Sequence, residues 1–471
     1  MLFGFWNLSP EMKINLRPQH ILYAILLSFI FAYWIGLFAV DRSISHGHVI
    51  WGDGLSYYEY LPSIFFDGDL NFQNQREWLL SQGVHYLGAN ALNKTATGYT
   101  WTPFPIGWAI LTAPFFLIAH AIVTIFSLPT DHSGYGFVYE SITNFGSVLG
   151  GLAGVIFAFR LLKLFFNVQT ALISICAFLF CSNLPYYIVV QASQAHSLGF
   201  FTISASAYYI VKASRSEFSF SKSVVLSGLF LGLAFITRPQ LLLAAICLYA
   251  YLINSKNGFK KSAISGLVAL PIALIQLYVW HVLFGKAITI PQGAGFMKWS
   301  SPEILGVLFS LRHGLFSWHP ITMLATTGFG LAFSLPRLKA RDNFLLVCLI
   351  GFIFQVYINA AASDWWAGNS FGSRRFIDTY IFLIFPLAFL VAKLQRYRIC
   401  WTIVIFLAIW NGLFFIQYRF CYIPRGDTIT PRQMFIDKFL LPALNRPYCT
   451  SANLRRFRHV AMSKYLKEQT A

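Results

Sequence analysis

The sequence is poor in charged residues, and in acidic residues above all. Only 11% of its 471 residues are Asp, Glu, Lys or Arg, whereas 57% are hydrophobic. A soluble globular chain carries about 25% charged residues. There are 17 acidic residues against 35 Lys and Arg, so the net charge is +18. This composition excludes an ordinary soluble globular protein and predicts an integral membrane protein, in which retained basic residues set the orientation.

Three familiar kinds of signal are also absent. No basic, glycine-rich or aromatic RNA-binding motif occurs, so the positive charge indicates no nucleic-acid partner. Residues 1–19 contain no apolar core with a small-residue cleavage site, so we expect the first apolar run to be an uncleaved anchor. The seven cysteines show no metal-type spacing. Five lie in apolar runs, whereas Cys421 and Cys449 lie in the C-terminal tail and could pair in an oxidising compartment.

Long apolar runs are abundant, and they predict an all-α polytopic membrane protein with about 11–13 transmembrane helices, since backbone groups in lipid must be satisfied within helices. The runs are 21–40, 104–127, 142–162, 170–190, 196–211, 223–237, 239–253, 262–284, 319–335, 343–362, 376–392 and 399–418. Prolines at positions 105 and 114 predict that 104–127 is re-entrant or broken. The short runs 223–237 and 239–253, joined at "TRPQ", predict a tight hairpin.

Basic residues in short loops predict the orientation. We assign to the cytoplasm the loops that contain Lys13, Arg17, Arg160, Lys163, Lys212, Arg215, Lys222, Lys256, Lys260, Lys261, Arg337, Lys339, Arg341, Lys393, Arg396 and Arg398. The expected organisation is a cytoplasmic N-terminus over 1–20 and a transmembrane domain over 21–418. That domain includes an outer loop over 41–103, in which we expect interfacial helices. The number of predicted membrane crossings places the basic tail, 419–471, on the outer side of the membrane.

The first outer loop contains the sequence "WGDGLSYYEY", with Asp53 between two glycines and Glu59 six residues later. A carboxylate at the outer end of a helix can act as a general base toward a hydroxyl. The alternative is a capping role, in which Asp53 accepts backbone N–H groups before a helix at about 55–66. The other polar motifs lie on the same predicted side, and together they favour a catalytic Asp53. We count Glu59 among the substrate-binding candidates.

"FFDGDLNF" follows in the same loop, with Asp67 and Asp69 on either side of a glycine. A D-x-D spacing can bind a divalent metal on a sugar nucleotide, which makes these two residues weak metal candidates. The favoured alternative is a glycine turn that closes an interfacial helix.

Two single residues stand out near the ends of apolar runs. His196, in "QASQAHSLGFF", can bind a phosphate or a hydroxyl, or can be a buried helix-end histidine. Arg238 lies in "FITRPQLLL", and an intramembrane arginine indicates a functional site unless it reaches the headgroups.

Two later segments supply further candidates. "LRHGLFSWHPI" contributes Arg312 and His313. "SDWWAGNSFGSRRFIDTY" contributes Asp364, Trp365, Trp366, Arg374 and Arg375. Paired arginines at a helix entrance suit phosphate binding, and the two tryptophans could stack on a sugar ring. The alternatives are a headgroup anchor for the arginines and an interfacial position for the tryptophans.

These phrases, together with "TPFPIGWAILTAPFFLIAH", resemble the GT-C superfamily of glycosyltransferases. The likeness is to its RgtA/B/C/D, aminoarabinose transferase and protein O-mannosyltransferase group, and it covers roughly residues 20–420. The resemblance implies a polyprenyl-phosphate-linked sugar donor and transfer on the outer face of the membrane. By position, Asp53 matches the family's catalytic Asp of the first loop. Arg238, Arg374 and Arg375 are matches to its phosphate-binding cations.

The sequence and the resemblance together predict an inverting glycosyltransferase of the bacterial inner membrane, with its site on the periplasmic side. Asp53 would deprotonate a hydroxyl of a glycan, lipid or protein acceptor, and Arg374 and Arg375, with Arg238 or His196, would hold the phosphate. No cofactor is required, although a divalent metal is possible. The alternative function is a transporter or flippase of a lipid-linked sugar, against which the sequence shows no paired broken helices in two matching halves.

Overall fold

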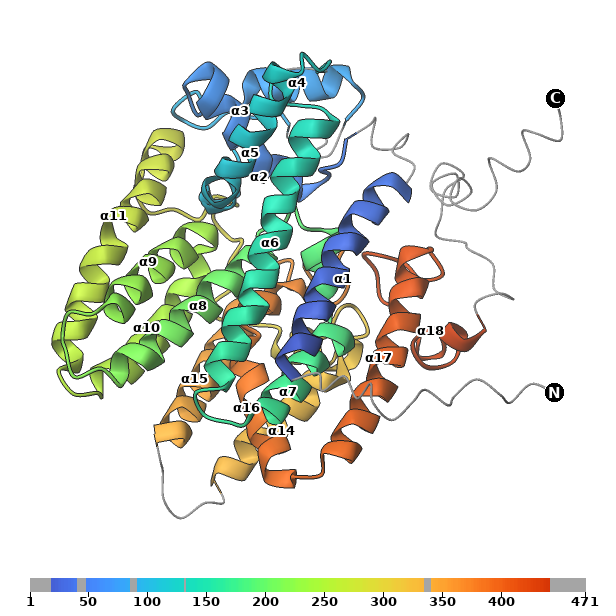
Figure 1. Ribbon diagram of the computed structural model, residues 1–471. Coiled ribbons are helices and arrows are strands. Elements are labelled where there is room, and N and C mark those ends of the chain that lie inside the picture. The colour runs from blue at the N-terminus through green and yellow to red at the C-terminus, as the bar shows by residue number, and fades with distance from the viewer. Residues whose placement is uncertain (1–17, 40–47, 85–90, 131–132, 334–339, 441–471) are drawn as a thin grey trace.

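The computed structural model describes residues 18–39, 48–84, 91–130, 133–333 and 340–440. The fold is 71% helical, and these ranges contain no β-strand beyond two isolated bridges. The prediction of an all-α membrane protein is confirmed (Figure 1).

Twelve helices of 12 residues or more form a bundle within the described ranges. They are α1 (Pro18–Ala39), α5 (Gly107–Ile125), α6 (Phe137–Leu162), α7 (Val168–Cys181), α8 (His196–Ser214), α9 (Lys222–Thr237), α10 (Leu242–Ile253), α11 (Gly258–Phe284), α14 (Pro320–Phe333), α15 (Ala340–Ala361), α16 (Ile381–Leu394) and α17 (Tyr397–Arg419). Six of these, α1, α5, α6, α11, α15 and α17, are long and apolar enough to cross a membrane alone. Four further apolar helices, α7, α9, α10 and α16, are shorter.

Small residues bring the helices close together. An added Cβ at Gly154 of α6 would lie 2.8 Å from the Cα of Phe201 in α8. At Gly328 of α14, an added Cβ would lie 2.6 Å from the backbone carbon of Pro386 in α16. Such close backbone approach is typical of helix packing in membranes, where van der Waals contact drives association. The helices thereby form one extended apolar core.

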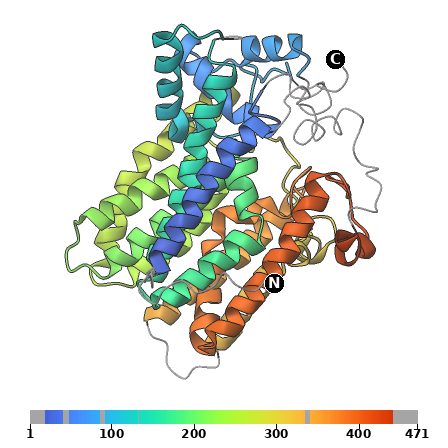
Figure 2. The same ribbon diagram turned by 45° about the vertical axis from the view of Figure 1, so that its right-hand side comes forward.

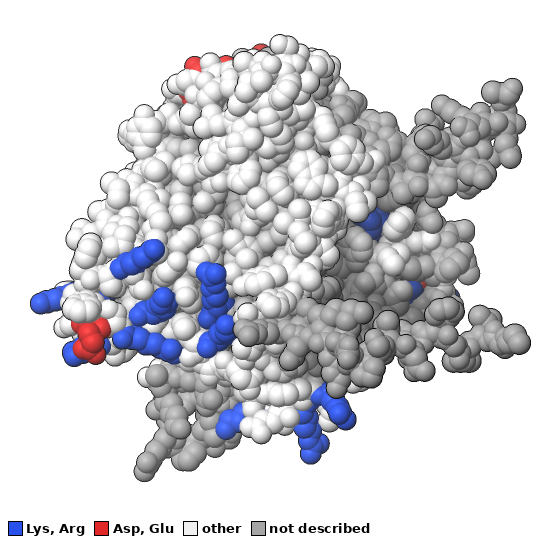
Figure 3. All heavy atoms as spheres, viewed as in Figure 1, with Lys and Arg blue, Asp and Glu red and all other residues white. Residues whose placement is uncertain are grey.

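Lys and Arg gather at one end of the bundle, and acidic residues are visible at the other (Figure 3). We call the first the basic end; it holds the connections α6–α7, α8–α9, α10–α11 and α16–α17. The residues on and beside these connections are Arg160, Lys163, Lys212, Arg215, Lys222, Lys256, Lys260, Lys261, Lys393, Arg396 and Arg398. The structure therefore brings together the described loops that the sequence assigns to the cytoplasm. We call the opposite end the site end.

The first loop folds over the site end as four short helices, as the sequence predicts (Figures 1 and 2). They are α2 (Asp53–Tyr58), α3 (Tyr60–Pro62), the π-helix η2 (Ser63–Asp67) and α4 (Gln73–Ser81). A second apolar core holds them on the bundle, built around aromatic residues such as Tyr58, Trp108 and Tyr135.

The segment 104–127 contains one continuous helix, α5, that accommodates Pro114, so the predicted break is wrong. Its predicted re-entrant course stays a prediction. A proline removes one intrahelical hydrogen bond but does not prevent a helix when its neighbours pack well. α5 packs along the first part of α6, where His120 is hydrogen-bonded to Tyr139 at 2.7 Å. Figure 2 shows α5 beside the first loop, at the site end.

The predicted hairpin is present. α9 ends at Thr237, a short turn follows over Arg238 and η5 (Pro239–Leu241), and α10 begins at once. The break at this turn leaves the guanidinium of Arg238 at the site end, where α9 stops.

The described part of the C-terminal tail lies against α17, with α18 (Pro431–Phe435) and η7 (Asp437–Phe439). Lys438 inserts over Trp410, with its Nζ 3.3 Å from the ring centroid. Cys421 is disulfide-bonded, whereas Cys449, its expected partner, lies outside the described residues. Arg312 donates a hydrogen bond to the Gly426 carbonyl at 2.7 Å, which ties the tail to the site end. The membrane side of the tail stays a prediction, as do the boundaries 1–20 and 419–471.

Candidate functional site

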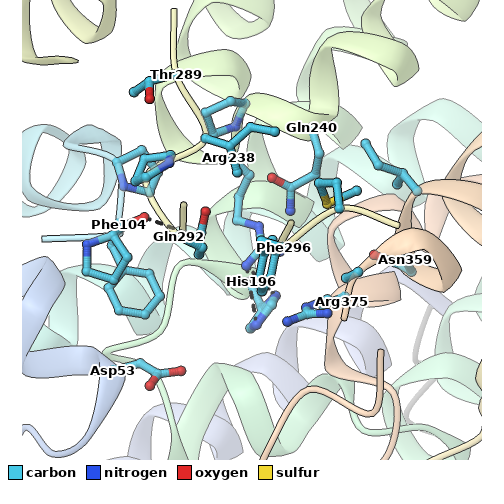
Figure 4. A pocket seen from close by; sticks show the side chains of 18 of the residues that line it. Asp53, Phe104, His196, Arg238, Gln240, Thr289, Gln292, Phe296, Asn359 and Arg375 are labelled. Carbon is cyan, nitrogen blue, oxygen red and sulfur yellow. Dashed lines mark hydrogen bonds between the residues drawn. The ribbon is translucent and has the colours of Figure 1, made fainter. Parts of the chain in front are cut away.

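A cavity of about 280 Å³ opens at the site end, between the first loop and five later segments of the chain (Figure 4). Its polar lining comes from Asp53, Tyr57, Gln194, His196, Arg238, Gln240, Thr289, Gln292, Asn359, Arg374 and Arg375. Its apolar lining includes Phe104, Trp280, Ile290, Phe296, Met297, Trp299 and Ile358. Figure 4 shows Arg238 and Arg375 reaching into it from different elements, with Asp53 at its edge. A mostly apolar pocket with a few convergent charged groups is typical of a ligand site.

Asp53 pairs with Arg374 across this cavity, with Oδ2 and Nη2 2.8 Å apart. The Asp53 side chain is 36% exposed, and Arg374 also donates a hydrogen bond to Gln194 Oε1 at 2.6 Å. Asp53 is the first residue of α2, and Gly52 is its N-cap residue. Among the described residues no backbone N–H donates to the Asp53 carboxylate, so the structure does not support the capping alternative. The expected meeting of the first loop with the twin-arginine loop is present, whereas its catalytic use stays a prediction.

Two contacts set the position of Asp53. Glu140 of α6 accepts hydrogen bonds from the backbone N–H groups of Val49 and Ile50, at 2.6 and 3.0 Å, which fixes the chain just before α2. Gly54 then lies against the loop before α8. An added Cβ there would lie 2.6 Å from the Cβ of Ser193 and closer still to its hydroxyl. The glycine is thus required for close approach, and the start of α2 is seated on that loop.

Arg375 has a different partner. Its Nη2 lies 2.7 Å from both carboxylate oxygens of Asp364, and its Nη1 donates to the Asp364 carbonyl at 3.1 Å. Asp364 does not line the cavity; it is 40% exposed and holds Arg375 in place from behind. The aromatic ring of Phe296 lies 6.0 Å from the guanidinium. Asp364 is therefore a positioning residue in this geometry, and the expectation that it binds substrate directly is not supported.

Arg238 lies between a carboxylate, an imidazole and an amide. Its Nε is 3.2 Å from Oδ2 of the fully buried Asp378, and its Nη1 is 3.3 Å from Nδ1 of His196. With its amide oxygen turned toward Arg238, Gln240 accepts a hydrogen bond from Nε at 2.7 Å. His196 and Arg238 thus lie together in the cavity wall, as the sequence suggested.

Burial and pairing act in opposite directions on these cations. Burial lowers the pKa of Arg374, but the adjacent Asp53 more than offsets this, so the pKa is raised overall. Burial also lowers the pKa of Arg375, and Asp364 opposes that shift without cancelling it. Both guanidinium groups stay charged, because the ordinary arginine pKa is so high. Burial raises the pKa of Tyr57 to about 12, so its phenol stays neutral and can donate a hydrogen bond.

Glu59 does not line the cavity, so the structure does not support its expected role in substrate binding, which stays a prediction. Its carboxylate forms two hydrogen bonds with Arg76 of α4, Oε1 to Nη2 at 2.7 Å and Oε2 to Nε at 3.0 Å. Both side chains are buried beneath the first loop. The pair holds α4 against the start of α3. A structural role in the first loop therefore accounts for the Glu59 carboxylate.

The residues of the segment 311–321 also lie outside the cavity wall. The guanidinium of Arg312 lies 3.8 Å from the ring centroid of Trp366. His313 Nδ1 lies 2.8 Å from the carbonyl oxygen of Trp366, and burial lowers the pKa of His313 to about 4, so this histidine is neutral. Trp365 packs on Gly306. Arg312 and His313 thus hold Trp366 of the loop 363–375 in place, and none of the four residues lines the cavity, so their expected role in substrate binding stays a prediction.

Asp67 and Asp69 form a turn, as the favoured alternative stated. Asp67 Oδ2 accepts a hydrogen bond from Asn74 at 3.0 Å, and Asp69 Oδ1 accepts one from Ser63 at 2.9 Å. The intervening glycine is left-handed and caps η2. Throughout the described ranges, no group of three or more His, Cys, Asp or Glu residues could hold a metal ion.

Several lining residues were not among the site candidates from the sequence. Gln194 bonds Arg374, and Asn359 enters from α15. The connection over 285–303 covers one side with Ile290, Gln292 and neighbouring residues. Its composition, rich in Gly and Pro with few charges, gives no catalytic signal by itself. Asp378 stands out in the sequence as an acidic residue near the start of the apolar run 376–392, but nothing in the sequence identifies Arg238 as its partner.

No family model and no curated protein matches this sequence. A solved structure does: ArnT from Cupriavidus metallidurans in the apo state. The match has a TM-score of 0.50 and 15% sequence identity, and it covers 84% of this chain and 69% of that one. ArnT is an aminoarabinose transferase of the GT-C type. At this identity the likeness shows the fold alone: the chain shares the fold of ArnT, which agrees with the fold that the sequence resemblance implies.

Proposed function

We propose that the protein is an inverting glycosyltransferase that moves a sugar from a polyprenyl-phosphate donor to an acceptor hydroxyl. The observation that carries the proposal is the convergence of Asp53 with Arg238, Arg374 and Arg375 in one cavity. These residues come from three separate segments of the chain. A base and a set of fixed cations around one cavity are what this reaction needs.

The reaction follows from the positions of these groups. The Asp53 carboxylate takes the proton of the acceptor hydroxyl, and the hydroxyl oxygen attacks the anomeric carbon. The bond from that carbon to the phosphate oxygen breaks on the opposite face, which inverts the configuration, and its electron pair stays on the phosphate. Arg238 and Arg375, with Arg374 when the donor displaces it from Asp53, stabilise the charge that grows there by charge-assisted hydrogen bonds.

The donor's lipid fits the apolar side of the cavity. Trp280 of α11 and Ile358 of α15 line it, and Tyr278 and Tyr357 on the same two helices are 64% and 39% exposed. An isoprenoid chain can run between these helices into the bilayer while its phosphate stays at the arginines. The acceptor, a glycan, lipid or protein, approaches from the side of Asp53, which is partly exposed.

Three arginines supply positive charge at the phosphate, so we propose no required cofactor, and a divalent metal stays possible. The basic end of the bundle supports a cytoplasmic assignment, because short loops rich in Lys and Arg are retained there. We therefore place the protein in the bacterial inner membrane with the cavity on the periplasmic side.

The test is transfer by the purified protein in detergent or nanodiscs. A panel of polyprenyl-phosphate sugars is incubated with candidate acceptors, and released polyprenyl phosphate and the anomeric configuration of the product are measured. We expect release with inversion by the wild type, no release by Asp53→Asn, and full release by the matched control Asp67→Asn. Full activity of the Asp53 variant would remove the proposed base. Movement of an intact donor across the bilayer, with no release, would indicate the alternative transporter.

A further inference from the structure

Asp378 is a buried carboxylate of this region that the proposed reaction does not use. It belongs to η6 (Arg374–Thr379), before the first residue of α16, and it is fully buried. The fold makes room for it: an added Cβ at Gly199 of α8 would lie 3.0 Å from its Cγ and closer still to Oδ1. α8 therefore passes directly over the carboxylate, and no side chain other than hydrogen fits there.

Four charged or titratable groups act on this carboxylate. Arg238, after α9, lies 3.2 Å away, and His196 of α8 lies 3.4 Å away. Arg374 on η6 and Tyr57 of α2 act on it through longer-range electrostatics. Among the described residues, neither oxygen of Asp378 accepts a hydrogen bond.

A buried carboxylate without hydrogen bonds depends on a neighbouring cation to stay charged. For Asp378 the nearest cation is Arg238, and burial raises the pKa of this carboxyl to about 7 despite that cation. Arg238 lines the cavity, whereas Asp378 does not. A phosphate that binds Arg238 therefore competes with Asp378 for the same guanidinium.

The charge balance of the site shows what this competition does. Arg238, Arg374 and Arg375 each lie within 3.2 Å of a carboxylate, so the positive and negative charges of these side chains nearly cancel. A phosphate anion adds negative charge that a buried site does not accommodate without compensation. Asp53 and Asp364 are 36% and 40% exposed and can remain hydrated anions, but Asp378 is 0% exposed.

We propose that Asp378 is the counter-ion of Arg238 in the empty site, and that it takes up one proton from solvent when the donor's phosphate replaces it beside Arg238. The inference rests on the proposed function, since it assumes a phosphate-linked donor. It implies that one proton binds to the protein together with the donor. Donor affinity then falls about tenfold for each pH unit above the pKa of the free carboxyl.

The experiment measures protons taken up when a defined ligand binds. The ligand is farnesyl methyl phosphate, a diester whose single charge does not titrate near neutral pH. Titration calorimetry of the full chain in detergent at pH 8, in two buffers of different ionisation enthalpy, gives the number of protons. We expect close to one for the wild type, none for Asp378→Asn, and close to one for the control Asp67→Asn, which lies outside the cavity. Between pH 7.5 and 9, the Kd should rise about tenfold per unit for the wild type and stay constant for Asp378→Asn.

The outcomes separate this inference from the function on which it rests. Binding to the wild type without proton uptake, or equal uptake by Asp378→Asn, overturns the role of Asp378 and leaves the phosphate site standing. No binding at any pH overturns the donor site and the inference together. If Asp378→Asn does not fold, infrared difference spectroscopy of the wild type decides. Ligand addition must then produce the C=O band of a protonated carboxyl, and its absence overturns the inference.

Discussion

Replacing Gly54 by Ala tests whether the seating of α2 on the loop before α8 positions the proposed base. The change neither adds nor removes a charged group, and Gly54 itself does not line the cavity. It adds one methyl group, whose carbon would lie 2.6 Å from the Cβ of Ser193 and closer to its hydroxyl. Real Cβ atoms do not approach so closely, so α2 must shift or Ser193 must move. Ser193 is almost fully buried, which leaves it little freedom.

The expected magnitude comes from two opposed effects. Overpacking a buried contact costs about 1–3 kcal/mol. Alanine is better than glycine inside a helix by up to about 1 kcal/mol. The net destabilisation is therefore small, about 0–2 kcal/mol, and the protein should still fold. The effect on catalysis is larger, because a displacement of about 1 Å at a catalytic group can lower the rate about 100-fold.

The assay is steady-state transfer combined with thermal unfolding. We expect Gly54→Ala to lower kcat by 10- to 100-fold with a Tm close to that of the wild type. The double variant Gly54→Ala/Ser193→Gly removes the atoms that the methyl group meets, so it should recover most of the lost rate. Unchanged kcat in Gly54→Ala would refute the reasoning. If Ser193→Gly does not restore the kcat lost in Gly54→Ala, the loss does not arise from the contact between these two residues.

Three further predictions concern other contacts. Glu59→Gln should lower the free energy of unfolding by about 3–5 kcal/mol, because it removes the carboxylate that pairs with the buried Arg76. The donor KM of the folded fraction should be unchanged, and a raised KM with normal stability would restore Glu59 to the substrate site. Arg374→Ala should raise the donor Kd at least tenfold, since a charge-assisted hydrogen bond contributes about 1.5–3 kcal/mol, and an unchanged Kd would remove Arg374 from phosphate binding. His313 should make the protein less stable in acid: its pKa is lowered from 6.5 to about 4 in the folded state, so stability is lost as the pH falls from 6.5 toward 4, by up to about 3 kcal/mol. Between pH 7 and pH 4.5 the Tm of His313→Gln should fall less than that of the wild type. An equal fall in Tm for both proteins would contradict the proposed effect of burying His313.

Much of the fold could be predicted because lipid leaves the backbone few choices. Apolar runs must become helices, and basic loops must gather at one end, so the bundle and its basic end follow from the sequence. The interfacial helix that begins near Asp53 was also predictable from its flanking glycines and aromatic residues. The shape of 104–127 was not, because a proline signals a possible break, whereas packing decides whether the helix continues through it.

The site was predictable in its charged members and not in their pairing. Asp53 and Arg374 stand out as polar groups on one predicted side of an apolar chain, and they meet. Glu59 stands out in the same way, yet it turns away to a buried arginine 17 residues later. Asp53 begins α2 and Glu59 follows its last residue, so the direction of each side chain depends on how α2 packs, through tertiary contacts such as Gly54 against Ser193. The charged residues of the loop 285–303, Lys286, Lys298 and Glu303, do not line the cavity, so only the structure shows that this loop does.

The central claim is that Asp53 acts as the base while the arginines hold the donor, and one sample of Asp53→Asn tests both parts. Donor binding and single-turnover release of polyprenyl phosphate are measured on the same preparation. Because the variant removes the carboxylate that competes for Arg374, we expect it to bind the donor at least as tightly as the wild type and to release no polyprenyl phosphate. Release at the wild-type rate, or loss of donor binding together with loss of transfer, would contradict the account.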